Sequence, residues 1–589
     1  MSTPNNRRRD PGGQSDEAIL IWTALIVVLL ALGSVWAAVH LGHRFAGLDE
    51  PLETNPFALF FAVLGGDVTW PTASTWVLVA TLTLGLVMLG LAGLGVHRWR
   101  RGRTRVDRAA MFMGRGRDVQ ALSRKHATTT ATRLGVTASP GVPIGLAVGS
   151  GAQLYGSWED MHIDIWGPRT GKTTSRAVPA ILDAPGAVLV TSNKRDVVDA
   201  TRGVRAEVGP VWVFDPQDLA LEQPTWWWNP LSYVTDEVRA ARLAEHFAAG
   251  SRDPGARTDA YFDPAGQDLL AGLLLAAALD ARPITDVYTW LTRPNDDTAV
   301  DVLREHGYRL TADQVAGVVS APEKQRGGIY GTAQQMASCL TNRAVARWIT
   351  PQPGPTRPHF DPATFVTTAG TLYSLSKEGR GTAGPLVTAL TVAVVEAAEE
   401  LAVQSPGGRL ATPLLGVLDE AANVCRWRDL PNLYSHYGSR GIVLMTILQS
   451  WSQGTEVWGE AGMRKLWSAS NIKVYGGGVS EATFLEDLSR MIGDYDRASS
   501  SVSSGRGHRT VSRQLHRERI LDVADLAVVL ASGSRPTLIR TQPWMNGPHA
   551  DAIRASIATN DPQARAQVHH TAPLTVTPAP APQRAEEDT

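Results

Sequence analysis

Residues 162–174 read His-Ile-Asp-Ile-Trp-Gly-Pro-Arg-Thr-Gly-Lys-Thr-Thr. An apolar, β-branched stretch runs into a glycine turn that ends in Gly171-Lys172-Thr173, and a helical pattern follows. Glycines let backbone N–H groups close on phosphate oxygens, a lysine reaches the β- and γ-phosphates, and a threonine hydroxyl at the helix start binds Mg²⁺. The stretch therefore predicts a nucleotide-phosphate loop at the end of a strand in an α/β fold.

The loop departs from the usual spacing G-x-x-x-x-G-K-[ST] at one place. The first glycine of that pattern falls on Trp166, and Gly167 comes one residue later. We expect the phosphates of ATP to lie against the residues that run from the turn into the helix, with Thr173 also a ligand of Mg²⁺. These candidate cofactor residues are Gly167, Pro168, Arg169, Thr170, Gly171, Lys172, Thr173 and Thr174.

Two long apolar stretches precede the loop, at residues 18–41 and 76–96, and neither contains Lys, Arg, Asp or Glu. Each is long enough to cross a bilayer. A cleaved signal peptide has a shorter apolar core and then a small-residue cleavage site, whereas here a second full-length stretch follows. We therefore expect two transmembrane helices in the inner (plasma) membrane, joined by a short extracytoplasmic loop at 42–75.

Arginines flank these two stretches on their outer sides. Three stand at 7–9 and six lie between 98 and 108, whereas the connecting loop contains the single Arg44 among several acids. The positive-inside rule then puts both chain ends in the cytoplasm, with a tail at 1–17 and a basic juxtamembrane segment at 97–150. We interpret the arginines of that segment as topology signals and contacts to anionic lipid, because the net charge of −1 gives no overall nucleic-acid signature.

Strand patterns alternate with helical patterns from about residue 155 onward, which is typical of a parallel α/β sheet. The interval 235–360 reads as helices only, so we expect an all-α domain inserted into a sheet domain formed by 151–234 and 361–545. Beyond the strand that enters the loop, the expected strands are 187–191, 211–214, 371–375, 414–418, 442–448 and 472–475, with a last pair at 527–530 and 537–540.

Three further segments have a simpler interpretation. We expect residues 546–589, rich in Pro and Ala with an acidic end, to be a disordered tail, and the Ser/Gly/Arg stretch 499–509 to be mobile. The run Trp226-Trp227-Trp228 favours core or interface packing over base stacking. The two cysteines, Cys339 and Cys425, have neither disulfide nor metal-ligand spacing.

A second nucleotide motif lies at residues 414–420, Leu-Leu-Gly-Val-Leu-Asp-Glu. An apolar strand that ends in two acids can place Asp419 beside Mg²⁺ and Glu420 beside an attacking water. The next predicted strand ends at Gln449, whose amide can sense the γ-phosphate. We therefore take Asp419 as a metal ligand and Glu420 and Gln449 as catalytic candidates.

The order of these and other short motifs resembles the TraG/TraD family of type IV secretion coupling proteins, over roughly residues 150–545. Besides the phosphate loop, the motifs are Thr191-Ser-Asn-Lys194, Phe214-Asp-Pro216, Asn229-Pro-Leu231, Leu418-Asp-Glu-Ala-Ala-Asn423, Ser439-Arg-Gly-Ile442, Leu448-Gln-Ser450 and Ser452-Gln453. The family consists of hexameric inner-membrane ATPases, each with a RecA-like motor domain and an all-α domain. They recruit a relaxase-bound single strand of DNA to a secretion channel.

This resemblance implies a RecA-like P-loop NTPase domain, ATP and Mg²⁺ as cofactors, and a homo-hexamer. The implied partners are single-stranded DNA with its relaxase and the proteins of a type IV secretion channel. Some relatives carry a trans-acting arginine before the glutamine strand. Here Gly438 falls at that place and Arg440 lies just after it, so Arg440 is the candidate catalytic arginine.

Two alternatives remain open at the level of sequence. An FtsK-like translocase of double-stranded DNA shares the membrane spans and the motor core, although no winged-helix-like domain follows at the C-terminus. A membrane receptor for the relaxosome that does not hydrolyse ATP would explain the tryptophan at 166, but the complete acidic pair argues against it.

Overall fold

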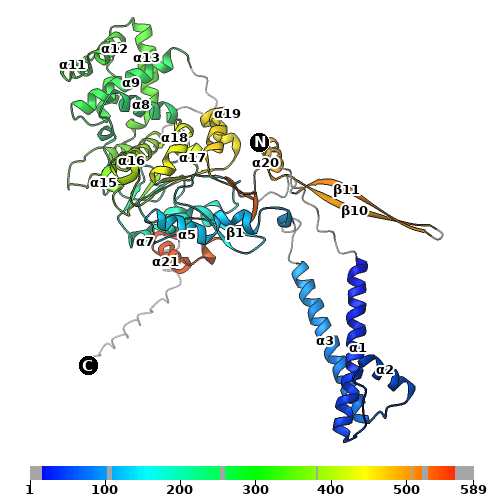
Figure 1. The fold of residues 1–589 in the computed structure, drawn as a ribbon. Coiled ribbons are helices and arrows are strands. Elements are labelled where there is room, and N and C mark those ends of the chain that lie inside the picture. The colour runs from blue at the N-terminus through cyan, green and yellow to red at the C-terminus, as the bar shows by residue number, and fades with distance from the viewer. Residues whose placement is uncertain are drawn as a thin grey trace, which may run out of the picture. The chain divides into compact units, whose positions relative to one another are not determined.

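The computed structural model describes residues 16–101, 109–251, 259–379, 382–505, 508–520 and 528–563. The chain forms two compact units, one of Met1–Phe112 with Leu488–Asp525 and the other of Met113–Asp487 with Leu526–Thr589 (Figure 1). Each unit has its own packing and is described separately.

The first unit begins with three helices, α1 (Asp16–Ala46), α2 (Pro56–Gly65) and α3 (Thr72–Arg101). Two windows, Ala24–Ala46 and Thr72–Leu91, are long and apolar enough to cross a membrane, with mean hydropathies of 2.3 and 1.9. Helices α1 and α3 pack against each other (Figure 1), while most of their apolar side chains stay exposed. Exposed aliphatic helices of this length are suited to a lipid environment.

The same unit contains an antiparallel pair of strands, β10 (Asp494–Gly505) and β11 (His508–Arg519). Their register runs from Asp494↔Arg519 to Gly505↔His508. The described residues of the stretch 499–509, which we expect to be mobile, belong to this hairpin. A hairpin of two strands has little stability of its own in water. Residues 506–507 lie outside the described part of the chain.

The second unit is built on an 11-stranded sheet with the order β2-β1-β13-β12-β9-β3-β8-β7-β4-β6-β5. Neighbouring strands from β9 to β5 run parallel, and the four strands from β12 to β2 extend the sheet in antiparallel fashion. The strands are β1 (Val142–Ala147), β2 (Gln153–Gly156), β3 (His162–Ile165), β4 (Val188–Ser192), β5 (Val211–Phe214), β6 (Thr371–Leu375), β7 (Leu414–Leu418), β8 (Ile442–Leu448), β9 (Ile472–Tyr475), β12 (Val528–Ala531) and β13 (Thr537–Arg540).

The central strands are buried along their whole length, as expected for a parallel sheet covered on both faces. Alternate residues of β7 and β8, such as Val417 and Met445, join one core cluster with α6 and α7. Helix α16 contacts the sheet through β4, β6 and β8. The helices of this unit around the sheet are α5 (Arg124–Arg133), α6 (Val178–Asp183), α7 (Asp196–Ala206), α15 (Pro362–Phe365), α16 (Gly384–Gln404), α17 (Ala421–Val424), α18 (Leu430–Tyr437) and α19 (Trp451–Ala469). Helix α20 (Ala482–Ile492) begins in this unit and ends in the first.

A group of helices interrupts the sheet between β5 and β6 (Figure 1). It consists of α8 (Glu237–Ser251), α9 (Phe262–Leu279), α10 (Thr285–Leu291), α11 (Thr298–Glu305), α12 (Arg309–Val319), α13 (Glu323–Met336) and α14 (Arg343–Ile349). Helix α9 is also apolar and long enough to cross a membrane, but half of its window is buried. It contacts α8, α11, α12 and α13 and so forms the core of this group.

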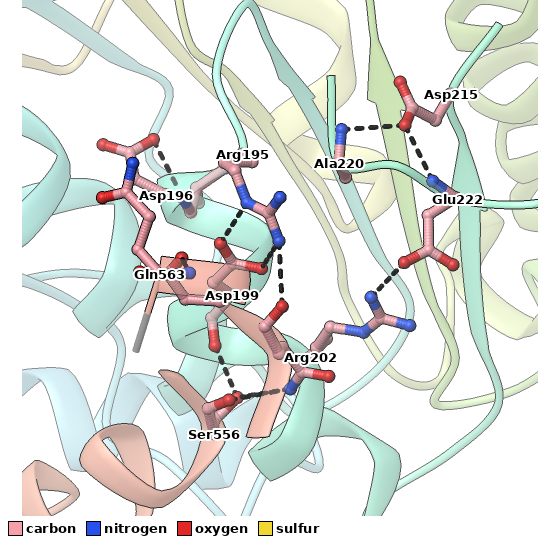
Figure 2. Close-up of polar contacts among 12 residues, drawn as sticks. Arg195, Asp196, Asp199, Arg202, Asp215, Ala220, Glu222, Ser556 and Gln563 are labelled. Carbon is pink, nitrogen blue, oxygen red and sulfur yellow. Dashed lines mark hydrogen bonds and ion pairs between the residues drawn. The ribbon is translucent and has the colours of Figure 1, made fainter. Parts of the chain in front are cut away.

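The domain built on the sheet extends beyond the expected boundaries of 151 and 545 at both ends. Strand β1 lies within the segment 97–150 that was expected to be a juxtamembrane extension, and it pairs with β13. After residue 545, helix α21 (Ala550–Asn560) packs on α7. Ser556 Oγ donates to the carbonyl of Asp199 at 2.6 Å (Figure 2). Arg195 Nη2 donates to the carbonyl of Asn560 at 2.9 Å. The tail was thus expected to begin too early; residues 564–589 lie outside the described part of the chain.

Candidate nucleotide site

The phosphate loop follows β3 and has the conformation that its glycines suggest. Gly171 has φ = +88°, and Arg169 also lies in the left-handed region with φ = +62°. Thr170 Oγ1 donates to the carbonyl of Gly167 at 2.6 Å, which closes the turn on itself. A helical turn, Thr173–Ala177, continues directly into α6, so the N–H groups of the loop lie at a helix start.

Trp166 occupies the place of the first glycine without entering the loop. Its side chain is fully buried, within a core cluster that includes residues of β1, β9 and β13. A Cβ on Gly476 would lie 2.0 Å from the indole ring, so the ring packs directly on that glycine. The close backbone approach occurs at Gly167, where a Cβ would lie 2.0 Å from the carbonyl oxygen of Gly478. Trp166 therefore serves core packing, and the glycine that the close backbone approach requires stands one residue later, at 167.

Four predicted side chains meet at the carboxyl ends of adjacent strands. Asp419 and Glu420 follow β7, Gln449 follows β8, and Lys172 comes from the loop after β3. Lys172 Nζ lies 3.3 Å from Asp419 Oδ1 and forms a short ion pair with Glu420. Gln449 Nε2 donates to Glu420 Oε1 at 2.6 Å. Glu420 itself has φ = +56°, a left-handed conformation that is uncommon for a residue with a side chain and typical of functional sites.

Burial dominates the electrostatics of this group. Desolvation raises the pKa of Asp419 to about 6; the charge of Lys172 opposes this rise and that of Glu420 adds to it. Burial alone would lower the pKa of Lys172, but Asp419 and Glu420 together raise it, so the lysine stays charged. A buried carboxylate beside a charged lysine at a strand end is a site prepared for a cation and for phosphate oxygens.

Two residues outside the predicted set hold Gln449 and the start of α19 in place. Gln453 Oε1 accepts from the backbone N–H of Gln449 at 2.9 Å. Glu481 accepts from the N–H groups of Trp451 and Ser452 at 2.8 and 3.0 Å, at the start of α19. The pair Ser452-Gln453 is one of the sequence motifs, but its positioning role becomes visible only from the way in which β8 leads into α19.

A buried ion pair beneath the loop was also missed from the sequence. Arg176 is fully buried and donates to Asp164 Oδ2 at 2.6 Å and to Oδ1 at 3.2 Å. It also donates to the carbonyl of Pro143 and lies 3.3 Å from Nδ1 of His162. Burial, followed by the charge of Arg176, holds the pKa of His162 well below its usual value, so this ring is neutral. Arg176 thereby ties β1 and β3 to the helix that carries the phosphate loop.

Arg440 does not lie with the other predicted residues at the nucleotide site. It ends a short turn, Gly438–Arg440, just before β8 begins, whereas Gln449 follows the other end of that strand. Its guanidinium forms an ion pair with Glu399 of α16. The expected role of Arg440 therefore depends on a neighbouring copy of the chain.

The tryptophan run packs as predicted. Trp226 and Trp228 are buried, and Trp226 contacts the rings of Trp212 and Trp348 at centroid distances of 5.3 and 5.6 Å. Trp227 makes an edge contact with His359 at 4.8 Å. These indoles link β5 to the segments that flank β6.

The sheet order and the site together define the class of protein. Strand β8 separates the phosphate-loop strand β3 from the acidic strand β7, and the polar groups of all three strands meet at one edge. This arrangement is that of a RecA-like P-loop NTPase.

Comparisons with known proteins narrow the class. A family model described as the TraM recognition site of TraD and TraG matches residues 413–529. The bacterial conjugative coupling protein TrwBΔN70, in its unbound monoclinic form, matches with a TM-score of 0.50 and 17% identity over 71% of this chain and 91% of that chain. Its trigonal form in complex with sulphate also matches with a TM-score of 0.50, at 14% identity over 72% and 94%.

A structure of TrwB in complex with ADP and Mg²⁺ gives a TM-score of 0.48 at 17% identity, over 72% of this chain and 94% of that chain. A search of curated proteins found no significant match. The family model thus matches residues 413–529, and the solved coupling-protein structures share the fold of this chain.

Proposed function

We propose that this chain is a membrane-anchored ATPase that couples a relaxase-bound DNA strand to a type IV secretion channel and drives its transfer in conjugation. The observation that carries the proposal is the meeting of Lys172, Asp419, Glu420 and Gln449 at one edge of the sheet, in a chain whose residues 413–529 match the family model of TraD and TraG. The apolar helices α1 and α3 supply the anchor.

The residues present fit a nucleotide with Mg²⁺. Asp419 Oδ1 is buried and, apart from its ion pair with Lys172 at 3.3 Å, has no partner among the described residues, so a hard oxygen ligand lies beside the lysine of the loop. Thr173 is the first residue of the helical turn, where its hydroxyl can complete the set. The ion would neutralise charge that develops on the β- and γ-phosphate oxygens.

The protein groups then have separate roles. Lys172 exchanges its two carboxylate partners for phosphate oxygens, and the residues 167–174 supply backbone N–H groups to the same phosphates. Release from Lys172 frees Glu420 to polarise an attacking water. Gln449, already bonded to Glu420, senses whether the γ-phosphate is present.

The active form in this proposal is a homo-hexameric ring with ATP at each boundary between subunits. Arg440 lies away from its own subunit's phosphate loop, and a neighbour's loop is where it would act. The ring would pass single-stranded DNA, delivered with its relaxase, to the channel proteins.

The test measures ATP hydrolysis by the full chain in lipid nanodiscs, alone and with single- or double-stranded DNA. We expect hydrolysis that single strands stimulate, and its loss, together with loss of DNA transfer in cells, in Lys172→Ala. The matched control Lys125→Ala changes an exposed lysine of α5 and should leave both activities intact. A wild-type chain without hydrolysis would favour the receptor alternative, and stimulation by duplex alone would favour the FtsK-like one.

The membrane topology has its own test. Reporter fusions at about residue 60 should lie outside the cytoplasm and fusions at about residue 110 inside, because arginines flank the two apolar helices on their outer ends. A cytoplasmic residue 60 would overturn the two-span arrangement.

A further inference from the structure

A turn that is not part of the predicted site is linked to Glu420 by hydrogen bonds through the side-chain amide of one asparagine. The turn, Ser376–Gly379, follows β6 and places the exposed Glu378 beside the acidic strand. Asn423 Nδ2 donates to Glu378 Oε1 at 2.9 Å and lies 3.5 Å from Glu420 Oε2. Asn193 Nδ2, at the end of β4, donates to the same oxygen of Glu378 at 2.7 Å. These contacts account for the two asparagines in the motifs at 191–194 and 418–423.

Glu378 is not needed to hold the turn itself. Gln217 Oε1 accepts from Ser376 Oγ at 2.9 Å and from the N–H groups of Lys377 and Ala383 at 3.0 and 3.2 Å. The side chain of Gln217 thus holds residues on both sides of the turn. The carboxylate of Glu378 is left to orient the two asparagines.

The partners of Glu420 explain why this contact matters during turnover. Its Oε1 is bonded to Lys172 and Gln449, the two groups that ATP phosphates would take. Its Oε2 faces Asn423, whose amide is directed by Glu378. Once phosphates occupy Lys172 and Gln449, Asn423 is the described side chain that still orients Glu420.

We propose that Glu378 is a positioning residue for ATP hydrolysis, acting on Glu420 through Asn423. The inference rests on the proposed ATPase function and concerns control of that same site. Glu378 and Asn423 also line a cavity of about 400 Å³ with Gly379, Thr382 and Gln453, which leaves the carboxylate of Glu378 room to turn away from Asn423. The turn after β6 is therefore a place where hydrolysis can be slowed without blocking nucleotide binding.

The test compares steady-state ATP hydrolysis by full-length variants in nanodiscs. Glu378→Ala should lower kcat about fivefold to twentyfold with little change in KM or in nucleotide affinity, as expected when one hydrogen bond to a catalytic group is lost. Glu378→Gln keeps an acceptor oxygen at the same reach and should retain most of the wild-type kcat. Lys377→Ala, on the same turn but with its side chain outside this set of contacts, is the matched control and should behave as wild type.

A double variant separates positioning from a general structural effect. If Glu378 acts through Glu420, adding Glu378→Ala to Glu420→Gln should cause no further loss of single-turnover rate. An equal loss in both backgrounds, or a wild-type kcat in Glu378→Ala, would overturn the inference while the ATPase proposal stands. A wild-type chain that does not hydrolyse ATP would instead overturn the proposed function.

Discussion

Trp166 and Gly476 form a contact whose strength can be measured by a double-mutant cycle. The indole is fully buried, and a Cβ on Gly476 would lie 2.0 Å from it. Trp166→Ala should cost about 3–5 kcal/mol through the cavity it leaves. Gly476→Ala alone should cost about 1–3 kcal/mol, because the added methyl group must push the ring out of its place.

The double variant is the informative one. With the indole gone, the methyl group at 476 enters empty space, so Gly476→Ala should cost almost nothing in the Trp166→Ala background. The double variant should then be more stable, by about 1–3 kcal/mol, than the sum of the two single effects predicts. Trp166→Phe is a control that keeps most of the volume and removes an indole N–H that has no hydrogen-bond partner among the described residues; it should cost less than Trp166→Ala.

Hydrogen exchange on peptides that cover β3 and β9 is the appropriate assay, because it reports the free energy of local opening in a chain with several domains. Additive effects of Trp166→Ala and Gly476→Ala would refute direct packing. Trp166→Gly supplies a further test, since it restores the usual first glycine of the loop. If that variant bound ATP more tightly and were as stable as the wild type, Trp166 would weaken nucleotide binding without stabilising the loop.

Three further predictions address catalysis and stability. Glu420→Gln should bind labelled ATP normally but hydrolyse it about 10²–10⁴-fold more slowly, because an amide cannot act as a base; loss of ATP binding would make Glu420 structural. Mixing Arg440→Ala with Lys172→Ala subunits should partly restore hydrolysis, because intact loops then face intact arginines; full activity of Arg440→Ala alone would remove that residue from the mechanism. Burial, with a smaller contribution from Arg242, lowers the pKa of His246 to about 4. Protonation at acid pH therefore favours the unfolded state, and α8 should lose about 3 kcal/mol of opening free energy between pH 6.5 and 4; hydrogen exchange should show a smaller loss in His246→Gln, and an equal loss in both proteins would contradict this assignment.

The sequence predicted the parallel part of the sheet well because its strands are uninterrupted apolar runs. The expected runs 414–418 and 442–448 coincide with β7 and β8. Strand β1 escaped notice because Pro143 and Gly145 interrupt its apolar pattern, and β10 and β11 because their sequences are polar. Strand β1 pairs with β13, which lies far along the chain, whereas β10 and β11 pair with each other.

The residues of the candidate site also fall into two groups, those that local sequence motifs predict and those that only the structure reveals. Lys172, Asp419, Glu420 and Gln449 stand at strand ends that the motifs mark, so their meeting could be predicted. Trp166, by contrast, could be understood only after the glycine run at 476–478 was found against it. The contacts of Glu378 with Asn193 and Asn423 likewise join segments far apart in the chain.

The pairing of β1 with β13 has a consequence for biosynthesis. Leu146 lies opposite Arg540, so the pair cannot form until almost the whole chain has left the ribosome. At about 5–20 residues per second, β1 waits roughly 20–80 s for its partner. During that interval β1 lacks the neighbour that later joins it to the rest of the sheet, and it is open to pairing with other chains. A nascent chain therefore carries its two apolar helices long before its nucleotide sheet is complete, and a chaperone that shields β1 would raise the yield of active protein.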